Sequence, residues 1–204
     1  MSTRNKEIDV LSQYDGDGVK SLKEFKIPAA SKELYVKTRE ALAKEGYFFI
    51  VDILPVSIGK IFGYTSENMR ATVPPQMEVV INPKKLTIGA SSSWPSDQRS
   101  AIEKEEAALK ARLPQEIRDL VGMPMQNTSV LMQIDDVYKE YTGKVLFTNW
   151  RGRTYDDQTS PGDSGSIGRS DPTSEIWGHD WNRGNEPGHV FAVPVVVLPR
   201  KLTV

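Results

Sequence analysis

Two short runs of β-branched and aromatic residues constrain the fold of this chain more than any other feature. They cover residues 47–54 and 189–198, and both are far shorter than the ~20 apolar residues of a membrane-spanning helix. The first run is continuously apolar, which predicts a central strand. The second is rich in Val and is interrupted by Pro194. A buried sheet is therefore expected, and helices must cover it.

One helical pattern precedes the first run, and two others lie between the runs. Ser31 is a predicted N-cap and Gly46 a predicted C-terminal stop for one helix. Ser96 is the predicted cap of a second helix at 97–112. A third, amphipathic helix is expected at 130–141 because its apolar residues recur at helical spacing, and Gly143 is its predicted end. Residues 76–82, 85–88 and 145–150 have weaker strand patterns. The sequence thus predicts an α+β fold, with one mixed sheet of about four or five strands covered by about four helices.

The length and the distribution of residue types indicate one domain. The chain has 204 residues, which suits a single globular domain. Within it, residues 1–30 are expected to form a helical and turn segment. Residues 151–188 are rich in Gly, Ser, Asp and Trp and are expected to form a long irregular loop before the last strand.

Composition excludes several classes of function. The net charge of −1 lacks the basic excess typical of nucleic-acid binders, so no nucleic-acid partner is expected. The absence of Cys excludes thiol catalysis and disulfides. The two standard glycine-rich nucleotide fingerprints are missing, and no cofactor is predicted. No signal peptide or membrane segment is expected either, which favours a cytoplasmic protein or a component of a virus particle.

A serine-protease motif is present only in part. The run from Pro161 to Gly165 resembles the Gly-Asp-Ser-Gly motif of chymotrypsin-like serine proteases. In that family the histidine base precedes the serine, whereas His179 and His189 both follow Ser164. No catalytic residue is therefore predicted.

A second partial motif lies near the N-terminus. Residues 13–25 resemble an EF-hand calcium loop, with Asp15, Asp17 and Glu24 at ligand positions. Gln13 replaces the first acidic ligand, Pro28 shortens the exit helix, and no second loop follows. A solvated turn explains the same residues, so calcium binding is an open alternative here.

Acidic residues within the predicted elements are expected to face water. This applies to the cluster Glu103 to Glu106 on the longest helix and to Asp135 and Asp136 opposite the apolar stripe of the next. Asp52, inside an apolar strand, is expected to face outward or to pair with a basic residue.

The densest group of potential binding residues lies in the predicted loop. Aromatic rings supply contact area there, and Asp, Asn and Arg supply directional hydrogen bonds. These candidate ligand- or partner-binding residues are Trp177, His179, Asp180, Trp181, Asn182 and Arg183. We interpret the chain as a non-catalytic binding or assembly protein with a protein partner or self-assembly.

Two alternatives stay open. His179, Asp180 and His189 with a nearby acid would suit a transition-metal site in a metal-assisted hydrolase. The same Trp, Asp and Asn residues would also suit a module that binds a carbohydrate or another small ligand.

Overall fold

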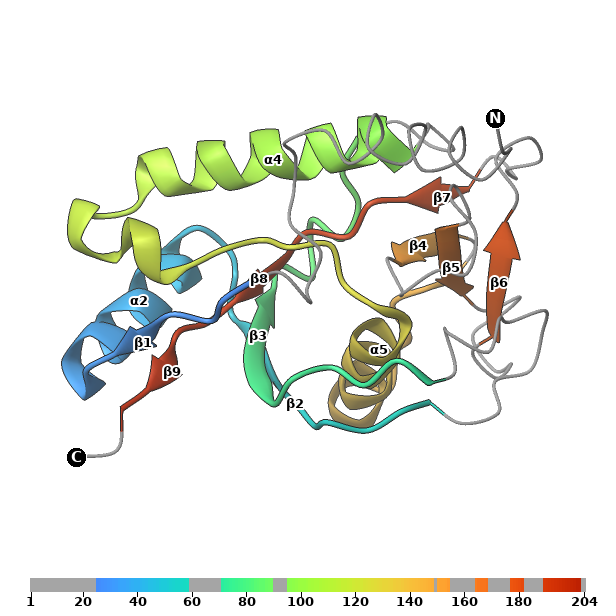
Figure 1. Ribbon diagram of the computed structural model, residues 1–204, viewed down its shortest axis with the longest axis horizontal. Coiled ribbons are helices and arrows are strands. Elements are labelled where there is room, and N and C mark those ends of the chain that lie inside the picture. The colour runs from blue at the N-terminus through green and yellow to red at the C-terminus, as the bar shows by residue number, and fades with distance from the viewer. Residues whose placement is uncertain are drawn as a thin grey trace, which may run out of the picture.

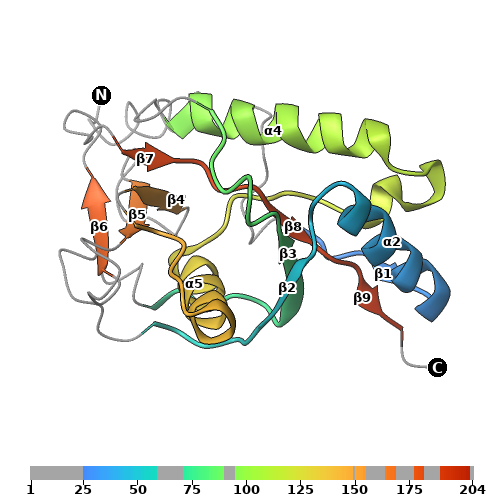
Figure 2. The same ribbon diagram turned by 180° about the vertical axis from the view of Figure 1, so that it is seen from behind.

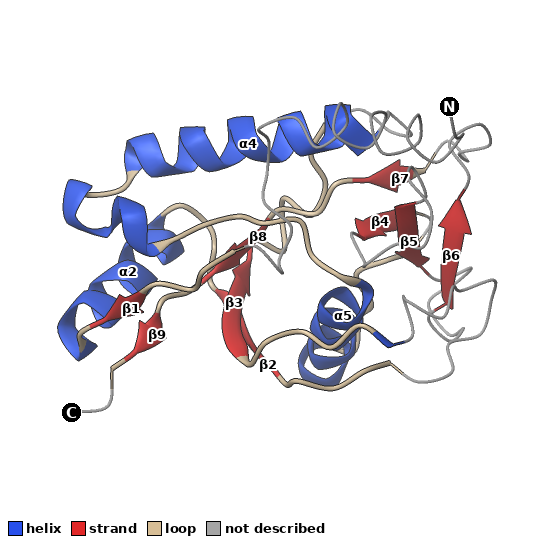
Figure 3. Ribbon diagram, in the orientation of Figure 1, coloured by secondary structure: helices blue, strands red, loops and turns tan. Residues whose placement is uncertain are grey.

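The protein is described by a computed structural model, which covers residues 25–58, 71–89, 95–148, 150–154, 164–168, 177–181 and 189–202. Helices and strands are both abundant, and the predicted α+β class is confirmed (Figures 1 and 3). The helices are α2 (Lys32–Lys44), α4 (Pro95–Arg112), α5 (Thr128–Thr142) and a 3₁₀ helix, η1 (Gln115–Leu120). The strands are β1 (Ala29–Ala30), β2 (Phe49–Ile53), β3 (Met77–Ile81), β4 (Arg151–Thr154), β5 (Ser164–Gly168), β6 (Trp177–Trp181), β7 (Val190–Phe191), β8 (Val195–Val197) and β9 (Arg200–Lys201).

The described strands form three small sheets, where the sequence predicted one mixed sheet. Their orders are β1-β9, β2-β3-β8 and β6-β5-β4-β7. The Val-rich run at 189–198 is divided between two of them, because β7 pairs in parallel with β4 and β8 pairs antiparallel with β3. Pro194 lies between the two strands and has no N–H to donate to a continuous ladder.

The three-stranded sheet is the centre of the hydrophobic core. Val79 and Val197 belong to the core cluster that α5 shares, whereas Val80 and Val196 belong to the cluster that α2 and α4 share. The sheet is therefore covered on both faces. α5 lies on one side of it, and α2 and α4 lie on the other (Figures 1 and 2).

β2 does not have the central position that its composition predicts. It lies at an edge of this sheet, and β3 is the central strand. Val51 and Ile53 are buried and Asp52 between them is exposed, so the prediction that Asp52 faces outward is confirmed.

Local capping signals locate α2 and α5 correctly. The hydroxyl of Ser31 accepts a hydrogen bond from the N–H of Leu34 at 3.2 Å, and Gly46 follows the helix with φ +89°. Gly143, with φ +69°, ends α5 as predicted. The left-handed backbone at both glycines is accessible to Gly without a steric cost.

The predicted apolar stripe of α5 is only partly buried. Val130, Leu131 and Ile134 are buried in the core, but Tyr141 is 78% exposed. The prediction that Asp135 is solvated is wrong. Its carboxylate is buried and accepts a hydrogen bond from the N–H of Leu146 at 2.7 Å, which joins α5 to the following chain. The strand predicted at 145–150 is not found among the described residues 145–148, and β4 begins at Arg151.

The acidic cluster of α4 is only partly solvated, because two of its carboxylates have partners in other segments. Glu106 pairs with Lys110 at 2.6 Å, and its other oxygen accepts a hydrogen bond from the N–H of Met123 at 2.8 Å. Glu105 accepts a hydrogen bond from the hydroxyl of Tyr47. These carboxylates therefore attach α4 to segments that follow and precede it, which a helical pattern alone does not reveal.

The last weak strand pattern, at 85–88, gives only one isolated bridge, from Ile88 to Ala192.

Candidate partner-binding surface

The segment 151–188 contributes three strands to the structure and is not one long irregular loop. β4, β5 and β6 form consecutive antiparallel pairs, and β7 pairs with the other edge of β4. Small residues allow α5 to pack closely on this sheet. A Cβ atom added at Gly152 would lie 3.1 Å from the side chain of Leu131 in α5, and 2.9 Å from those of Phe147 and Val193, so only glycine fits without displacement. The prediction of an irregular loop was wrong because Gly and Ser are depleted in strands only on average, and long-range pairing decides each case.

The two faces of this sheet have different surroundings. Gly152 and Ile167 are opposite each other on the face that packs against α5. The alternation of a strand puts Arg153 and Ser166 on the other face, and each is only 1% exposed. The sheet is thus buried on both faces where β4 and β5 pair.

A buried hydrogen-bond network fixes this second face to α4. The Nε of Arg153 donates to the side-chain oxygen of Gln98 at 2.7 Å, and the amide nitrogen of Gln98 donates to the carbonyl of Val190 at 2.9 Å. One glutamine therefore connects α4 to β4 and β7. Burial also lowers the pKa of the neighbouring Arg151, since desolvation disfavours a charged group.

Four of the six predicted binding residues lie in β6, namely Trp177, His179, Asp180 and Trp181. Asn182 and Arg183 lie outside the described residues. In the register of β5 and β6, position 179 is opposite Ser166, and position 166 is in turn opposite Arg153. Positions 177, 179 and 181 share this face of the strand, and position 180 belongs to the opposite face.

β6 is an edge strand. It is the first strand in the order β6-β5-β4-β7 and pairs along its whole length with β5. Within the part of the chain that the structure describes, no other strand pairs with its second edge. Figures 1 and 2 place it at the end of the molecule opposite to α2.

The register does not bring together the residues proposed for a transition-metal site. His189 is exposed and directly precedes β7, at the other edge of the sheet from His179. Two strands lie between them, so their backbones are roughly 14 Å apart at the usual spacing of strands. Asp180 adjoins His179 but belongs to the opposite face of β6. Among the described residues, no group of three acidic or His side chains could hold a metal ion.

The predicted calcium ligands lie outside the described residues; they are Asp15, Asp17 and Glu24.

The serine of the partial protease motif, Ser164, is the first residue of β5 and is opposite Trp181.

Sequence reasoning missed the buried polar residues Gln98, Arg153 and Ser166. A signal was available for Arg153, because Arg151 and Arg153 alternate with Gly152 and Thr154 in the two-residue period of a strand. Nothing comparable marks Gln98, which lies in the first turn of a helix with many polar residues.

Comparison with known proteins gives no further information, since no family model, curated protein or solved structure matches this chain. None of the described helices has the length and apolar character that a bilayer crossing requires.

Proposed function

We propose that this chain is a non-catalytic binding or assembly protein, and that β6 is its contact surface. The partner contributes a strand that extends the four-stranded sheet beyond β6. The observation that carries the proposal is the position of β6 as an edge strand with five residues paired to β5.

An edge strand suits this role because the N–H and C=O groups of its outer edge can pair with a strand of another chain. A strand of five residues spans roughly 17 Å, which is long enough for a partner strand to align by several main-chain hydrogen bonds. Main-chain pairing supplies affinity in this mode, and side chains on alternating positions supply specificity.

The residues of β6 favour recognition as well. Trp177 and Trp181 are its two end residues, and both positions belong to the same face. Trp is among the residues most enriched at energetically dominant contacts between proteins, and a Trp ring contributes a large area with little conformational entropy to lose.

The neighbouring strands provide a rigid support. Ile167 is fully buried, and Arg153 is held by Gln98 at 2.7 Å. A contact surface built on such a framework loses less conformational entropy on binding than a free loop does.

Proline substitution in β6 tests the proposal. Adjacent residues of a strand direct their N–H groups to opposite edges of the strand. The test uses the two variants His179→Pro and Asp180→Pro. One of them removes an N–H that donates to β5, and the other removes an N–H on the outer edge of β6. The melting temperature identifies the outward variant as the more stable one. His179→Ala and Asp180→Ala are the matched controls, since they change the same side chains but keep the N–H.

Two readouts measure association. Sedimentation equilibrium measures self-association. A photoreactive p-benzoylphenylalanine at position 181 captures another partner in a lysate of cells that make the protein, with Tyr141→p-benzoylphenylalanine as an exposed aromatic control. We expect one of these associations in the wild type, retained in both alanine controls and lost in the outward proline variant. The proposal would be refuted if both proline variants still associate, or if the wild type shows no association by either measurement.

Tryptophan variants give an independent result. If Trp177→Ala and Trp181→Ala each lower the free energy of unfolding by ~3 kcal/mol or more, both rings belong to the core. The proposal then fails, because at least one ring must be available to a partner.

A further inference from the structure

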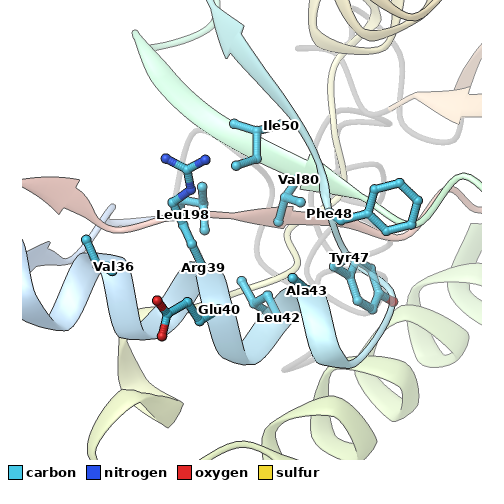
Figure 4. Close-up of a pocket in the computed structure, with 10 residues that line it drawn as sticks. All are labelled: Val36, Arg39, Glu40, Leu42, Ala43, Tyr47, Phe48, Ile50, Val80 and Leu198. Atoms are coloured by element: carbon cyan, nitrogen blue, oxygen red, sulfur yellow. The ribbon is translucent and has the colours of Figure 1, made fainter. Parts of the chain in front are cut away.

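A pocket lies at the other end of the molecule, between α2 and the three-stranded sheet. Its volume is about 340 Å³, at the small end of the ~300–1,000 Å³ range of ligand pockets. Figure 4 shows the lining side chains, which come from α2, the chain just before β2, β2 itself, β3 and the chain after β8.

The interior of the pocket is apolar. Leu42, Tyr47, Val80 and Leu198 line it and are almost completely buried. Two further apolar lining residues are in contact with water: the exposed fraction is 44% for Val36 and 53% for Phe48. An apolar ligand that covered them would remove this surface from water, which is favourable in proportion to its area.

One basic side chain lines the pocket. The guanidinium of Arg39 lies 5.7 Å from the centre of the Tyr35 ring, and the ammonium of Lys201 lies 5.8 Å from the same centre. The ion pairs of the described residues use other basic groups and include neither Arg39 nor Lys201. Two cations thus lie near the Tyr35 ring, whose hydroxyl donates a hydrogen bond to the carboxylate of Glu78 at 2.6 Å. Arg39 itself forms no ion pair among the described residues, so its guanidinium can still pair with an anion.

The acidic residue of the lining has a different orientation. In Figure 4 the Arg39 guanidinium is directed toward Ile50, whereas the Glu40 carboxylate is directed away from it. An anionic group placed next to Arg39 would therefore meet the cation first, and Glu40 would weaken its binding through a longer-range repulsion.

We propose that this pocket binds a small amphipathic anion, in which an apolar chain or ring carries one carboxylate or sulfonate group. The apolar part occupies the space between Leu42, Val80 and Phe48, and the anionic group pairs with Arg39. Arg suits this contact because its planar fork can donate two parallel hydrogen bonds to a carboxylate. The site is separate from β6 and does not depend on the function proposed for that strand.

Three probes with the same chain and different head groups test the proposal. Titrations with octanoate, 1-octanol and octylammonium, followed by ¹H–¹⁵N NMR, report which residues respond and how strongly. We expect saturable shifts at Val36, Ala43 and Phe48 with octanoate. The affinity for octanoate should exceed that for 1-octanol by about tenfold or more, as charge-assisted hydrogen bonds are stronger than neutral ones. Octylammonium should bind most weakly.

Matched variants assign the effect to the proposed residues. Arg39→Gln should reduce the affinity for octanoate to that for 1-octanol, and Glu40→Gln should increase it. Lys44→Gln, on the same helix but outside the lining, is the control for overall charge. Ala43→Trp should block all three probes, and because Ala43 is exposed the fold should tolerate it.

Three results would overturn the proposal. They are the absence of saturable shifts at the lining residues, equal affinity for the three probes, and an equal loss in Lys44→Gln and Arg39→Gln.

Discussion

Gly152 is the position at which the packing of α5 on the four-stranded sheet can be tested most directly. A Cβ atom there would meet Phe147 and Val193 at 2.9 Å and Leu131 at 3.1 Å. All three neighbours are buried, so none can move into solvent. Overpacking of a core costs ~1–3 kcal/mol, and the lower backbone entropy of Ala returns roughly 0.5–1 kcal/mol. Gly152→Ala should therefore destabilise the protein by about 1–2 kcal/mol.

A double-mutant cycle with Leu131→Ala measures the contact itself. Leu131→Ala alone should cost ~3–5 kcal/mol, because it leaves a cavity beside β4. In the Gly152→Ala background the new methyl group enters part of that cavity. The double variant should therefore be more stable than the sum of the single changes predicts, by about 1 kcal/mol or more. Urea denaturation followed by circular dichroism supplies each free energy of unfolding.

The control cycle combines Leu131→Ala with Ser31→Ala. Ser31 caps α2, which packs in the other core cluster, and its loss should cost ~1 kcal/mol. These two changes should add within ~0.5 kcal/mol. If Gly152→Ala and Leu131→Ala also add within that range, α5 does not contact β4 at position 152. The assignment of faces on β4, β5 and β6 would then be refuted.

Two further predictions concern side chains with specific partners. Glu106→Ala removes the acceptor for the N–H of Met123 and the partner of Lys110. It should lower the free energy of unfolding by about 1–2 kcal/mol. The control Lys104→Ala, on the exposed part of α4, should lower it by under ~0.5 kcal/mol in the same urea assay. Equal losses would contradict the contacts of Glu106. Burial, and then the hydrogen bond to Glu78, raise the pKa of Tyr35 from 10.0 to about 12, so above pH 10 the folded chain keeps a proton that the unfolded chain releases. Its contribution to stability is complete below pH 10 and is lost as the pH rises toward 12. The melting temperature of Tyr35→Phe should accordingly decrease less steeply than that of the wild type from pH 10 upward, and parallel curves would show that Tyr35 titrates normally.

Local signals in the sequence were sufficient to locate the principal helices. Ser31 and Gly46 mark the ends of α2, and Gly143 marks the end of α5. Each of these signals acts within one or two turns, through a side-chain cap or a left-handed backbone, so it depends little on the rest of the chain. The α+β class followed from the same information, because helices and β-branched runs alternate along the sequence.

The candidate binding surface could be predicted only in part. The composition of 177–181 singled out the residues of β6, but not that they form a strand. Strand formation there depends on pairing with β5 and, through it, with β4. Such pairing is a property of segments distant in sequence, and Gly-rich runs such as 164–168 carry almost no intrinsic preference for it.

The sequence by itself determined the positions of α2, α4 and α5, the cap of α2 at Ser31 and the outward direction of Asp52 in β2. The predicted cap of α4 was wrong, because α4 begins at Pro95 and includes Ser96. Only the tertiary structure decided which strands share a sheet, that β2 and β6 are edge strands, and that Asp135 and Glu106 accept hydrogen bonds from distant N–H groups. The physical reason is the range of the interactions. Helical hydrogen bonds and caps join residues three or four apart, whereas a sheet or a buried carboxylate is stabilised by partners that meet only when the whole chain has folded.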